Sequence, residues 1–198
     1  MLFRSRILWT FSAAYRLFRA PQYLTIAKRA FDYIQIYFID KEYGGVYWEL
    51  DCEGNPVNTK KQTYAQGFAL YGFSEYYRAV GDENALELAK EFFYLIEKTK
   101  DKNRGGYFEA FTREWQAIDD MRLSEKDANE KKTMNTHLHI LEPYTNLCRI
   151  WKNPQLQAAQ RELIEIFMRQ ILDYNTYHLN LFFDEDWRVK STAISYGH

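Results

Sequence analysis

Cysteine is scarce in this chain of 198 residues, and only Cys52 and Cys148 occur. Two cysteines this far apart supply neither a disulfide framework nor the closely spaced ligands of a zinc site. The sequence therefore excludes a small disulfide-stapled scaffold. It indicates two free thiols in a reducing compartment, and thus predicts a cytoplasmic protein.

Long apolar runs and an excess of one charge are also missing. No stretch approaches the roughly 18 apolar residues of a membrane span. Residues 1–18 faintly resemble a signal peptide, but arginines such as Arg4 and Arg16 interrupt the apolar run, so we expect the first helix of the fold there. Lys and Arg (26) nearly balance Asp and Glu (27), giving a net charge of −1. Without a basic stripe or a charged tail, no nucleic-acid or polyionic partner is expected.

Aromatic residues are abundant, with 16 Tyr, 14 Phe and 5 Trp making up 18% of the chain. Aromatic rings line carbohydrate clefts because the C–H face of a sugar packs on them, but they also fill protein cores. The abundance is compatible with both. The chain is long enough for one good-sized core or two small ones.

Three copies of one unit follow one another along the chain. Apolar residues recur at three- and four-residue intervals in six segments, which we expect to be helices at residues 6–18, 22–38, 61–80, 82–99, 134–151 and 153–172. Tight turns join the helices of each pair at Ala20-Pro21, Gly81-Asp82 and Asn153-Pro154. An aromatic stretch after each pair is expected to form a short β-hairpin: GGVYWELDCEG, GGYFEAFTREW and LNLFFDEDW.

Repeated helical hairpins stack side by side, each covering the apolar face of its neighbour. If the stack closes into a ring, the first helices of the pairs form an inner wall and the second an outer wall, which is an α/α toroid. The alternative is an open helical solenoid with a protein-binding groove. The aromatic hairpins favour the toroid because plain helical solenoids have none.

The segment KTMNTHLHILEPY, residues 132–144, carries the clearest polar pattern. On a helix, Asn135, His139 and Glu142 share one face, whereas His137 points nearly the opposite way. An amide and an imidazole on adjacent turns suit a polar ligand whose oxygens are held and whose protons move. The alternative is that His139 is a buried core histidine bonded to a neighbour.

Polar residues also recur at the start of each expected inner helix. These residues are Arg6, Tyr64, Asn135 with His139, and His198 at the chain end. Equivalent positions in a ring of repeats face one central cavity, so these groups are expected to converge there as a small-molecule site. Each residue alone has an ordinary explanation, namely a surface ion pair for Arg6, the core for Tyr64 and a frayed terminus for His198.

Several stretches resemble the N-acylglucosamine 2-epimerase superfamily, and most closely its cellobiose 2-epimerase branch. They span nearly the whole chain in family order: SRILWTFSAAYR, EYGGVYWELDCEG, KKQTYAQGFALYGFSEYYRA, RLSEKDA, TMNTHLHILEPYTNL, LFFDEDWR and SYGH. The resemblance implies an all-α fold, a partial (α/α)6 toroid of three helical hairpins with short β-hairpin insertions. Family members are about twice as long, so residues 1–198 are expected to form a single incomplete barrel domain, truncated at both ends.

The resemblance also implies a reaction, reversible epimerisation at C2 of a reducing-end sugar through an enediolate, without a metal or another cofactor. By motif match, His198 is one of two catalytic histidines, and Arg6 stabilises negative charge on the sugar oxygens. Tyr64, Asn135 and His139 hold the substrate, and Asp127 touches the sugar beyond the reducing unit. The second catalytic histidine has no counterpart in this sequence. The chain alone is therefore expected to be inactive and to self-associate through exposed barrel edges.

Other functions remain open at this stage. The same fold serves N-acylglucosamine 2-epimerases and mannose isomerases, and much of the choice of sugar lies in the half that is missing here. An inverting α/α-barrel glycosidase needs two carboxylates flanking a sugar bond, but the expected site offers mainly Arg, Tyr, Asn and His, with only Asp127 nearby. A non-enzymatic binding fragment is the third alternative.

Overall fold

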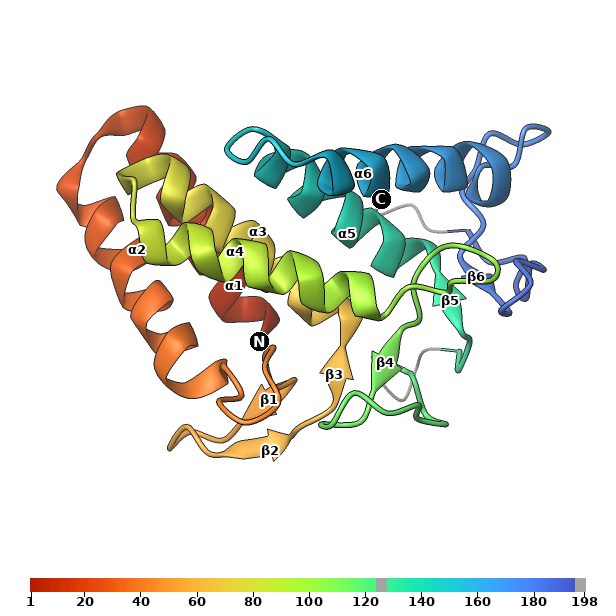
Figure 1. Cartoon of the computed structure of the whole chain (residues 1–198), viewed down its shortest axis with the longest axis horizontal. Coiled ribbons are helices and arrows are strands. Elements are labelled where there is room, and N and C mark those ends of the chain that lie inside the picture. Colours follow the sequence, from red (N-terminus) through yellow and green to blue (C-terminus); the bar gives the residue numbers. More distant parts are fainter. Residues whose placement is uncertain (124–127, 195–198) are drawn as a thin grey trace.

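Three antiparallel helix pairs make up most of the fold (Figure 1). The structure is a computed structural model that describes residues 1–123 and 128–194. In these residues the pairs are α1 (Leu2–Phe18) with α2 (Pro21–Tyr33), α3 (Thr63–Val80) with α4 (Glu83–Lys98), and α5 (Met134–Cys148) with α6 (Pro154–Ile166). The π-helical turns η1 (Ile34–Phe38) and η2 (Phe167–Ile171) extend α2 and α6. The six expected helices are confirmed.

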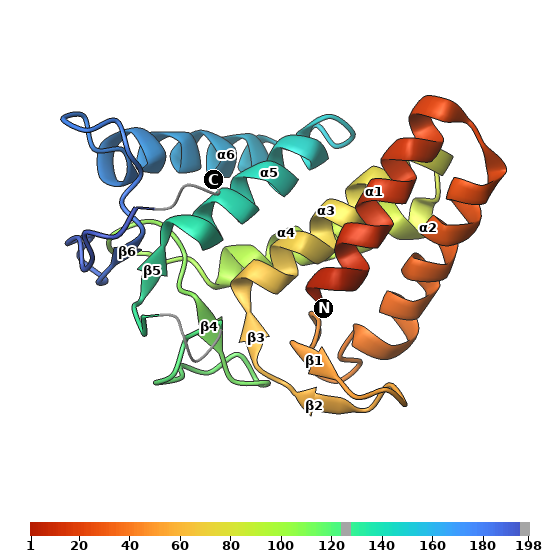
Figure 2. The same cartoon turned by 180° about the vertical axis from the view of Figure 1, so that it is seen from behind.

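The first helices of the three pairs lie together in one layer, and the second helices lie in another. Figure 2 shows α1, α3 and α5 in front, which we call the inner layer, with α2, α4 and α6 behind as the outer layer. Helix α3 is central, because it packs against α1, α4 and α5. None of the helices in the described part of the chain is long and apolar enough to cross a membrane.

The tight turns between paired helices carry the capping residues expected from the sequence. Gly81 ends α3 in the left-handed conformation, with φ of 73°, where a residue without a Cβ is preferred. The Asp82 side chain then accepts a hydrogen bond from the Ala85 N–H. The Asn153 side chain caps α6 in the same way, with Pro154 as the first helical residue. Between α3 and α4 these caps stop one helix and start the next within two residues.

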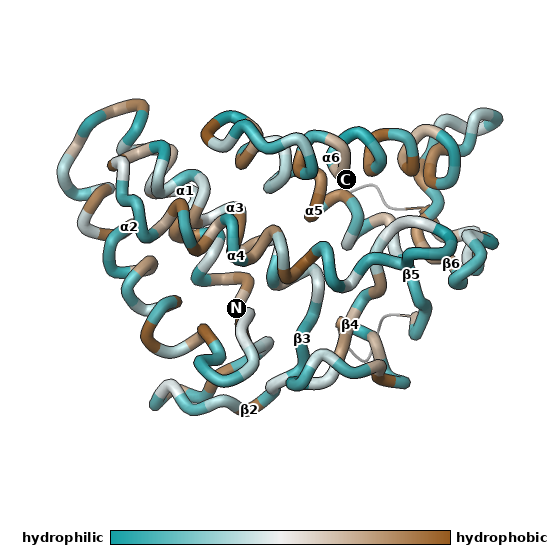
Figure 3. Tube along the Cα trace, in the orientation of Figure 1, coloured by the Kyte–Doolittle hydropathy of each residue, from teal (hydrophilic) through white to brown (hydrophobic). Residues whose placement is uncertain are grey.

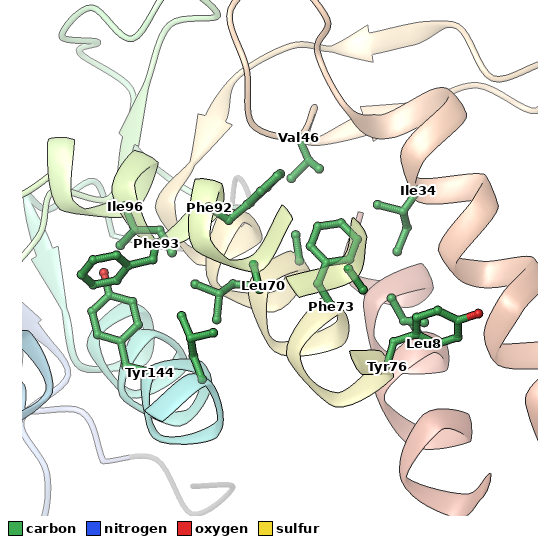
Figure 4. Close-up of a cluster of buried hydrophobic side chains, with 14 of the residues drawn as sticks. Leu8, Ile34, Val46, Leu70, Phe73, Tyr76, Phe92, Phe93, Ile96 and Tyr144 are labelled. Carbon is green, nitrogen blue, oxygen red and sulfur yellow. The ribbon is translucent and has the colours of Figure 1, made fainter. Parts of the chain in front are cut away.

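The core lies between the two layers, around α3 (Figure 4). Its labelled side chains come from both layers and from the first loop: Leu8, Ile34, Val46, Leu70, Phe73, Tyr76, Phe92, Phe93, Ile96 and Tyr144. Phe73 and Phe92 meet edge to face with ring centroids 5.4 Å apart. Figure 3 shows hydrophobic and hydrophilic residues alternating along the helices, as expected for elements with one buried face. Part of the aromatic excess therefore fills this core.

The aromatic stretches differ in one respect from the expected self-contained hairpins. Only the first pairs two strands within itself, β1 (Glu49–Leu50) with β2 (Pro56–Asn58). In the others, β4 (Ala110–Phe111) pairs with β3 (Lys61–Gln62), and β6 (Phe182–Phe183) pairs with β5 (Lys132–Thr133). Within these two stretches the hairpin is reduced to the isolated bridges Phe111–Ala117 and Phe183–Val189. The strands join successive repeats because an extended dipeptide precedes each of the inner helices α3 and α5.

A tight loop recurs after each outer helix, and it begins with an aspartate. The backbone N–H of Asp40 donates to the Gly45 carbonyl, that of Asp101 to Gly106, and that of Asp173 to His178. In each copy the aspartate side chain also accepts hydrogen bonds from backbone N–H groups of the loop. The three unit copies inferred from the aromatic stretches thus share one pattern of loop hydrogen bonds.

A buried lysine of the following repeat clamps each of the first two loops. Lys61 Nζ lies 2.9 Å from an Asp40 carboxylate oxygen, and Lys132 Nζ lies 2.8 Å from Asp101. Burial by itself raises the pKa of Asp40, but hydrogen bonds from Arg113 and Lys61 outweigh it, so this pKa lies well below its ordinary value. Both lysines immediately precede an inner helix, so the ion pairs fix where α3 and α5 begin.

A second contact also holds each of the first two loops against the following inner helix, and its side chain differs between the two copies. The Gln66 side-chain oxygen accepts a hydrogen bond from the Val46 N–H at 2.8 Å. In the next repeat His137 Nε2 accepts from the Tyr107 N–H at 3.0 Å, while its Nδ1 faces the Thr133 carbonyl at 2.6 Å. His137 is fully buried, and burial, aided by the nearby charge of Lys132, lowers its pKa to about 4. His137 is thus a structural histidine, on the side of α5 away from His139, as predicted.

The buried position of His137 predicts a specific pH dependence of the free energy of unfolding. Unfolding returns His137 to an ordinary pKa near 6.5, so the unfolded chain takes up a proton first, and stability falls as the pH drops from 6.5 toward 4. Between pH 7 and pH 5 the loss from this residue is roughly 2 kcal/mol. His137→Gln, which copies Gln66, is expected to keep the bond to Tyr107 and remove this loss. Urea unfolding of both proteins at the two pH values measures it, and an equal loss in both would contradict the assignment.

Candidate active site

Three of the polar residues expected to converge do meet, at the start of the inner layer. Arg6 lies in the first turns of α1, while Tyr64 and Asn135 are the second residues of α3 and α5. Tyr64 stands between the other two, because it hydrogen-bonds with both Arg6 and Asn135. The N-terminal turns of three successive inner helices thus place three different side chains in one cluster.

The Tyr64 hydroxyl is the centre of this cluster. Arg6 Nη2 donates to it at 3.4 Å, and Asn135 lowers its pKa as a hydrogen-bond donor does. Burial is the larger effect, and the pKa of Tyr64 is raised overall. The phenol therefore stays protonated at neutral pH. Because it accepts from two neighbours, its own proton can be donated to a bound oxygen.

His139 joins the cluster from the next turn of α5. Its ring meets the Tyr64 ring edge to face, with centroids 4.9 Å apart, and lies 4.7 Å from the Phe68 centroid. Its Nδ1 is 2.7 Å from an oxygen of Glu142. The Arg6 guanidinium also lies over the Phe68 ring, at 5.1 Å. The expected shared face of Asn135, His139 and Glu142 is thus found, with both aromatic and ionic contacts to the imidazole.

A cavity of about 170 Å³ opens beside Asn135. Glu109, Thr133 and Leu181 contribute to its wall. Asn135 Oδ1 is buried and has no hydrogen-bond partner within the described ranges. Since an unpaired buried acceptor costs about 1–3 kcal/mol, this oxygen is suited to receive a hydroxyl group from a ligand.

Gly67 allows α3 and α5 to approach closely at the cluster, and the sequence analysis did not single it out. A Cβ on this residue would lie 2.4 Å from the backbone carbonyl oxygen of His139. A glycine inside a helical pattern is a signal of close backbone approach. It brings the helix of Tyr64 against the helix of His139.

A second polar cluster, which sequence reasoning also missed, lies further along the same helices. The fully buried Glu75 on α3 accepts hydrogen bonds from Arg16 of α1 at 2.8 Å and from Arg78 at 2.6 Å. Asn146 of α5 bonds to both Glu75 and Arg78. Because these side chains satisfy one another, the cluster joins the three inner helices and is a structural element.

Two residues assigned from the resemblance, Asp127 and His198, lie outside the described residues. Within residues 1–123 and 128–194, no group of three or more His, Cys, Asp or Glu side chains is arranged to hold a metal ion. Cys52 is an exposed free thiol and Cys148 is a half-buried one.

The close helix contact predicts a sharp effect of Gly67→Ala. The new methyl would meet the rigid carbonyl of His139, so α3 and α5 must separate, and we expect a loss of about 1–3 kcal/mol in unfolding free energy. Gly72→Ala on the same helix is the matched control, because its Cβ would meet mainly the flexible end of Leu8, at 2.9 Å. Urea unfolding compares the two variants. A smaller loss for Gly67→Ala than for Gly72→Ala would contradict the proposed role of the contact.

Comparison with known proteins places this chain in a family. The family model for N-acylglucosamine 2-epimerase (GlcNAc 2-epimerase) matches residues 1–195. A cellobiose 2-epimerase of Bacteroides fragilis is 56% identical over 100% of this chain and 50% of its own length. One from Ruminococcus albus is 42% identical over 100% of this chain and 51% of its length. The solved cellobiose 2-epimerase of Spirochaeta thermophila superposes with a TM-score of 0.92 at 39% identity, covering 100% of this chain and 49% of that one.

These matches confirm the resemblance found in the sequence, and with it the fold: three helical pairs of an (α/α)6 toroid. The chain spans about half the length of the curated relatives it matches. Because the family model covers residues 1–195, the chain belongs to the N-acylglucosamine 2-epimerase family.

Proposed function

We propose that this chain supplies one part of the active site of a sugar 2-epimerase that acts on a reducing-end sugar, with cellobiose as the leading substrate. The observation that carries the proposal is the meeting of Arg6, Tyr64, Asn135 and His139 from three successive repeats. The names of the relatives, cellobiose 2-epimerases, support the choice of sugar.

The proposed reaction inverts the configuration at C2 of the open-chain aldose. A base removes the C2 proton, the electrons move onto the carbonyl to give an enediolate, and a proton returns to C2 from the opposite face. One rigid side chain cannot serve both faces, so two acid–base groups are needed. We assign His198 as one of them, from its place in the SYGH motif.

Arg6 is proposed to stabilise the enediolate. Its guanidinium is permanently charged and is held against Tyr64 and the Phe68 ring. Such a fixed cation stabilises negative charge that develops on O1 and O2 in the transition state more than it stabilises the neutral sugar. Arg6 therefore acts on the rate of the proton transfers.

Tyr64, Asn135 and His139 are proposed to orient the sugar. Tyr64 has a hydroxyl proton to donate, and the buried Asn135 oxygen can accept one from a sugar hydroxyl. His139 offers an imidazole beside both. Asp127 is assigned to the sugar unit beyond the reducing end from its place in the SEKDA motif. Together these groups would hold the open-chain sugar with C2 near the catalytic bases.

Other reactions fit the described residues less well. An inverting glycosidase needs two carboxylates about 6.5–9.5 Å apart across the scissile bond, whereas the carboxylate of Glu142 is bonded to His139. An N-acylglucosamine 2-epimerase or a mannose isomerase would use the same proton chemistry on another sugar. A binding fragment without activity is the remaining alternative.

The cytoplasmic location inferred from the two thiols stays a prediction.

Activity is best tested in a chimera that joins this chain to the half of the Bacteroides fragilis relative outside the matched region. We expect the chimera to convert cellobiose to its C2 epimer. His198→Ala should lower kcat at least 100-fold, because acid–base catalysis contributes about 10²–10⁴-fold. Arg6→Ala should lower it by about 10²–10³-fold, because it removes a group that stabilises charge in the transition state. Tyr64→Phe should lower it only about tenfold, the value of one hydrogen bond.

The same assay in D2O separates the alternatives. The 198-residue chain by itself is expected to give no net epimer, and at most to exchange the C2 hydrogen from one face. Epimer formed by the chain alone above its His198→Ala control would overturn this expectation. An inactive chimera with native-like circular dichroism would reject the epimerase assignment, and full turnover in His198→Ala would remove that residue from the catalytic pair.

The chain alone is also expected to self-associate through its apolar edges. On α1 the side chains of Phe3, Leu17 and Phe18 are 81%, 66% and 71% exposed, and exposed apolar surface promotes association. Sedimentation velocity should show concentration-dependent oligomers. The double variant Leu17→Glu and Phe18→Glu should shift them toward monomer, with Lys28→Glu on the α2 surface as a charge control. A wild-type chain that stays monomeric at high concentration would contradict the prediction.

A further inference from the structure

Glu142 makes an ionic contact with the imidazole of the candidate site. It follows His139 by three residues on α5, so the two side chains lie on the same helical face. Its Oε2 is 2.7 Å from His139 Nδ1, a length typical of a charge-assisted hydrogen bond. The His139 side chain is 13% exposed and that of Glu142 is 38% exposed, so the pair is partly sheltered from water.

The contact fixes which imidazole nitrogen carries the proton. An ionised carboxylate can only accept hydrogen bonds, so Nδ1 must be the donor. Neutral His139 is then the Nδ1–H tautomer, and Nε2 is the nitrogen that gains or gives a proton. The Tyr64 and Phe68 rings pack against the imidazole and limit how far it can tilt. Tautomer and orientation are thus set together.

The repeat architecture shows that the scaffold does not require this pair. In the preceding repeat the positions of His139 and Glu142 are taken by Phe68 and Tyr71, which lie on α3 in the same register. Those residues carry no charge, and α3 is nonetheless the most completely packed helix of the inner layer. An imidazole–carboxylate pair at this place therefore serves something other than helix packing.

Glu142 also faces the second polar cluster. It lines a cavity of about 110 Å³ with Trp9, Tyr71 and the arginines Arg16, Arg78 and Arg149. Burial raises the pKa of Tyr71, the negative charges of Glu142 and Glu75 raise it further, and the charge of Arg149 opposes them. The carboxylate thus has the His139 imidazole on one side and the guanidinium groups of this cavity on the other.

We propose that Glu142 is a positioning residue that holds His139 in the Nδ1–H tautomer, so that Nε2 is directed to the sugar oxygens. The catalytic part of this inference rests on the proposed epimerase function, whereas the tautomer part does not. Glu142 itself touches no substrate in this scheme and acts through His139. A tautomer set in advance spares the site a reorganisation during the reaction.

The tautomer is measured directly on the 198-residue chain. Two-bond ¹H–¹⁵N spectra at a pH where imidazoles are neutral report which ring nitrogen is protonated, and a His139→Gln spectrum assigns the signal. We expect the wild type to be protonated at Nδ1. Glu142→Gln should give a mixture, because an amide can either accept from Nδ1 or donate to it. An unchanged tautomer in Glu142→Gln overturns the proposal, whatever the activity.

Activity in the chimera tests the catalytic consequence. Glu142→Gln should lower kcat/KM for cellobiose roughly 10- to 100-fold, as expected for the loss of one charge-assisted hydrogen bond. Glu142→Asp, which keeps the charge, should recover part of the loss. Glu87→Gln is the matched control, because Glu87 forms an i,i+3 pair with Lys90 on the outer helix α4, and its turnover should equal that of the wild type.

The outcomes separate this proposal from the epimerase assignment. If the wild-type chimera has no activity, the epimerase assignment fails while the spectra still decide the tautomer. If the tautomer changes but kcat/KM of an active chimera does not, the positioning role is overturned. A fall of equal size in Glu87→Gln would likewise overturn it, since the loss would then not belong to His139.

Discussion

Two buried ion pairs determine how the repeats of this chain are joined. Lys61 and Lys132 are fully buried, and each meets the aspartate of the loop in the preceding repeat. Removing one partner of such a pair would leave an uncompensated charge in the interior, at a cost of about 3–5 kcal/mol. An apolar pair could pack there as well, but it would not specify which loop meets which helix. The pairing of unlike charges therefore fixes the register between repeats.

The site depends on this register. Each lysine stands three residues before the cluster residue of the helix that follows it, Tyr64 or Asn135. Because the ion pair fixes where that helix begins, the first helical turn can direct the cluster residue in only one direction. Gly67 then lets the two helices approach until the ring of Tyr64 meets that of His139. The geometry of the cluster is thus set by contacts outside it.

Much of this could be predicted from the sequence, because it depends on local patterns. Apolar periodicity, Gly81, Asp82 and Asn153 located the helices and their turns, and the repeat register brought Arg6, Tyr64 and Asn135 together. The buried lysines were not foreseen, since a lysine beside a polar turn normally lies in water. The pairing of strands between repeats was also missed, because a two-residue strand has no periodicity to detect.

The equivalence of Gln66 and His137 shows another limit of sequence patterns. Both accept a hydrogen bond from the backbone N–H that follows a glycine pair, yet an amide and an imidazole differ in shape and in chemistry. The common requirement is an acceptor at a fixed point, and several side chains satisfy it. A histidine in this chain can therefore either hold the repeats together or belong to the candidate site, and only its surroundings show which role it has.

The same contrast distinguishes the positions that hold the repeats together from the positions of the candidate site. Positions that hold the repeats together keep the same physical task. An aspartate closes the loop in all three copies, and in the first two a cation reaches it and an acceptor binds one backbone N–H. At the site positions the task changes from copy to copy, giving a guanidinium at Arg6, a phenol at Tyr64 and an amide at Asn135. Repetition of the frame makes these places equivalent in space, and this equivalence lets unlike groups meet. A site that needs a cation, a proton donor and an acceptor around one small molecule can arise in this way without any change in the fold.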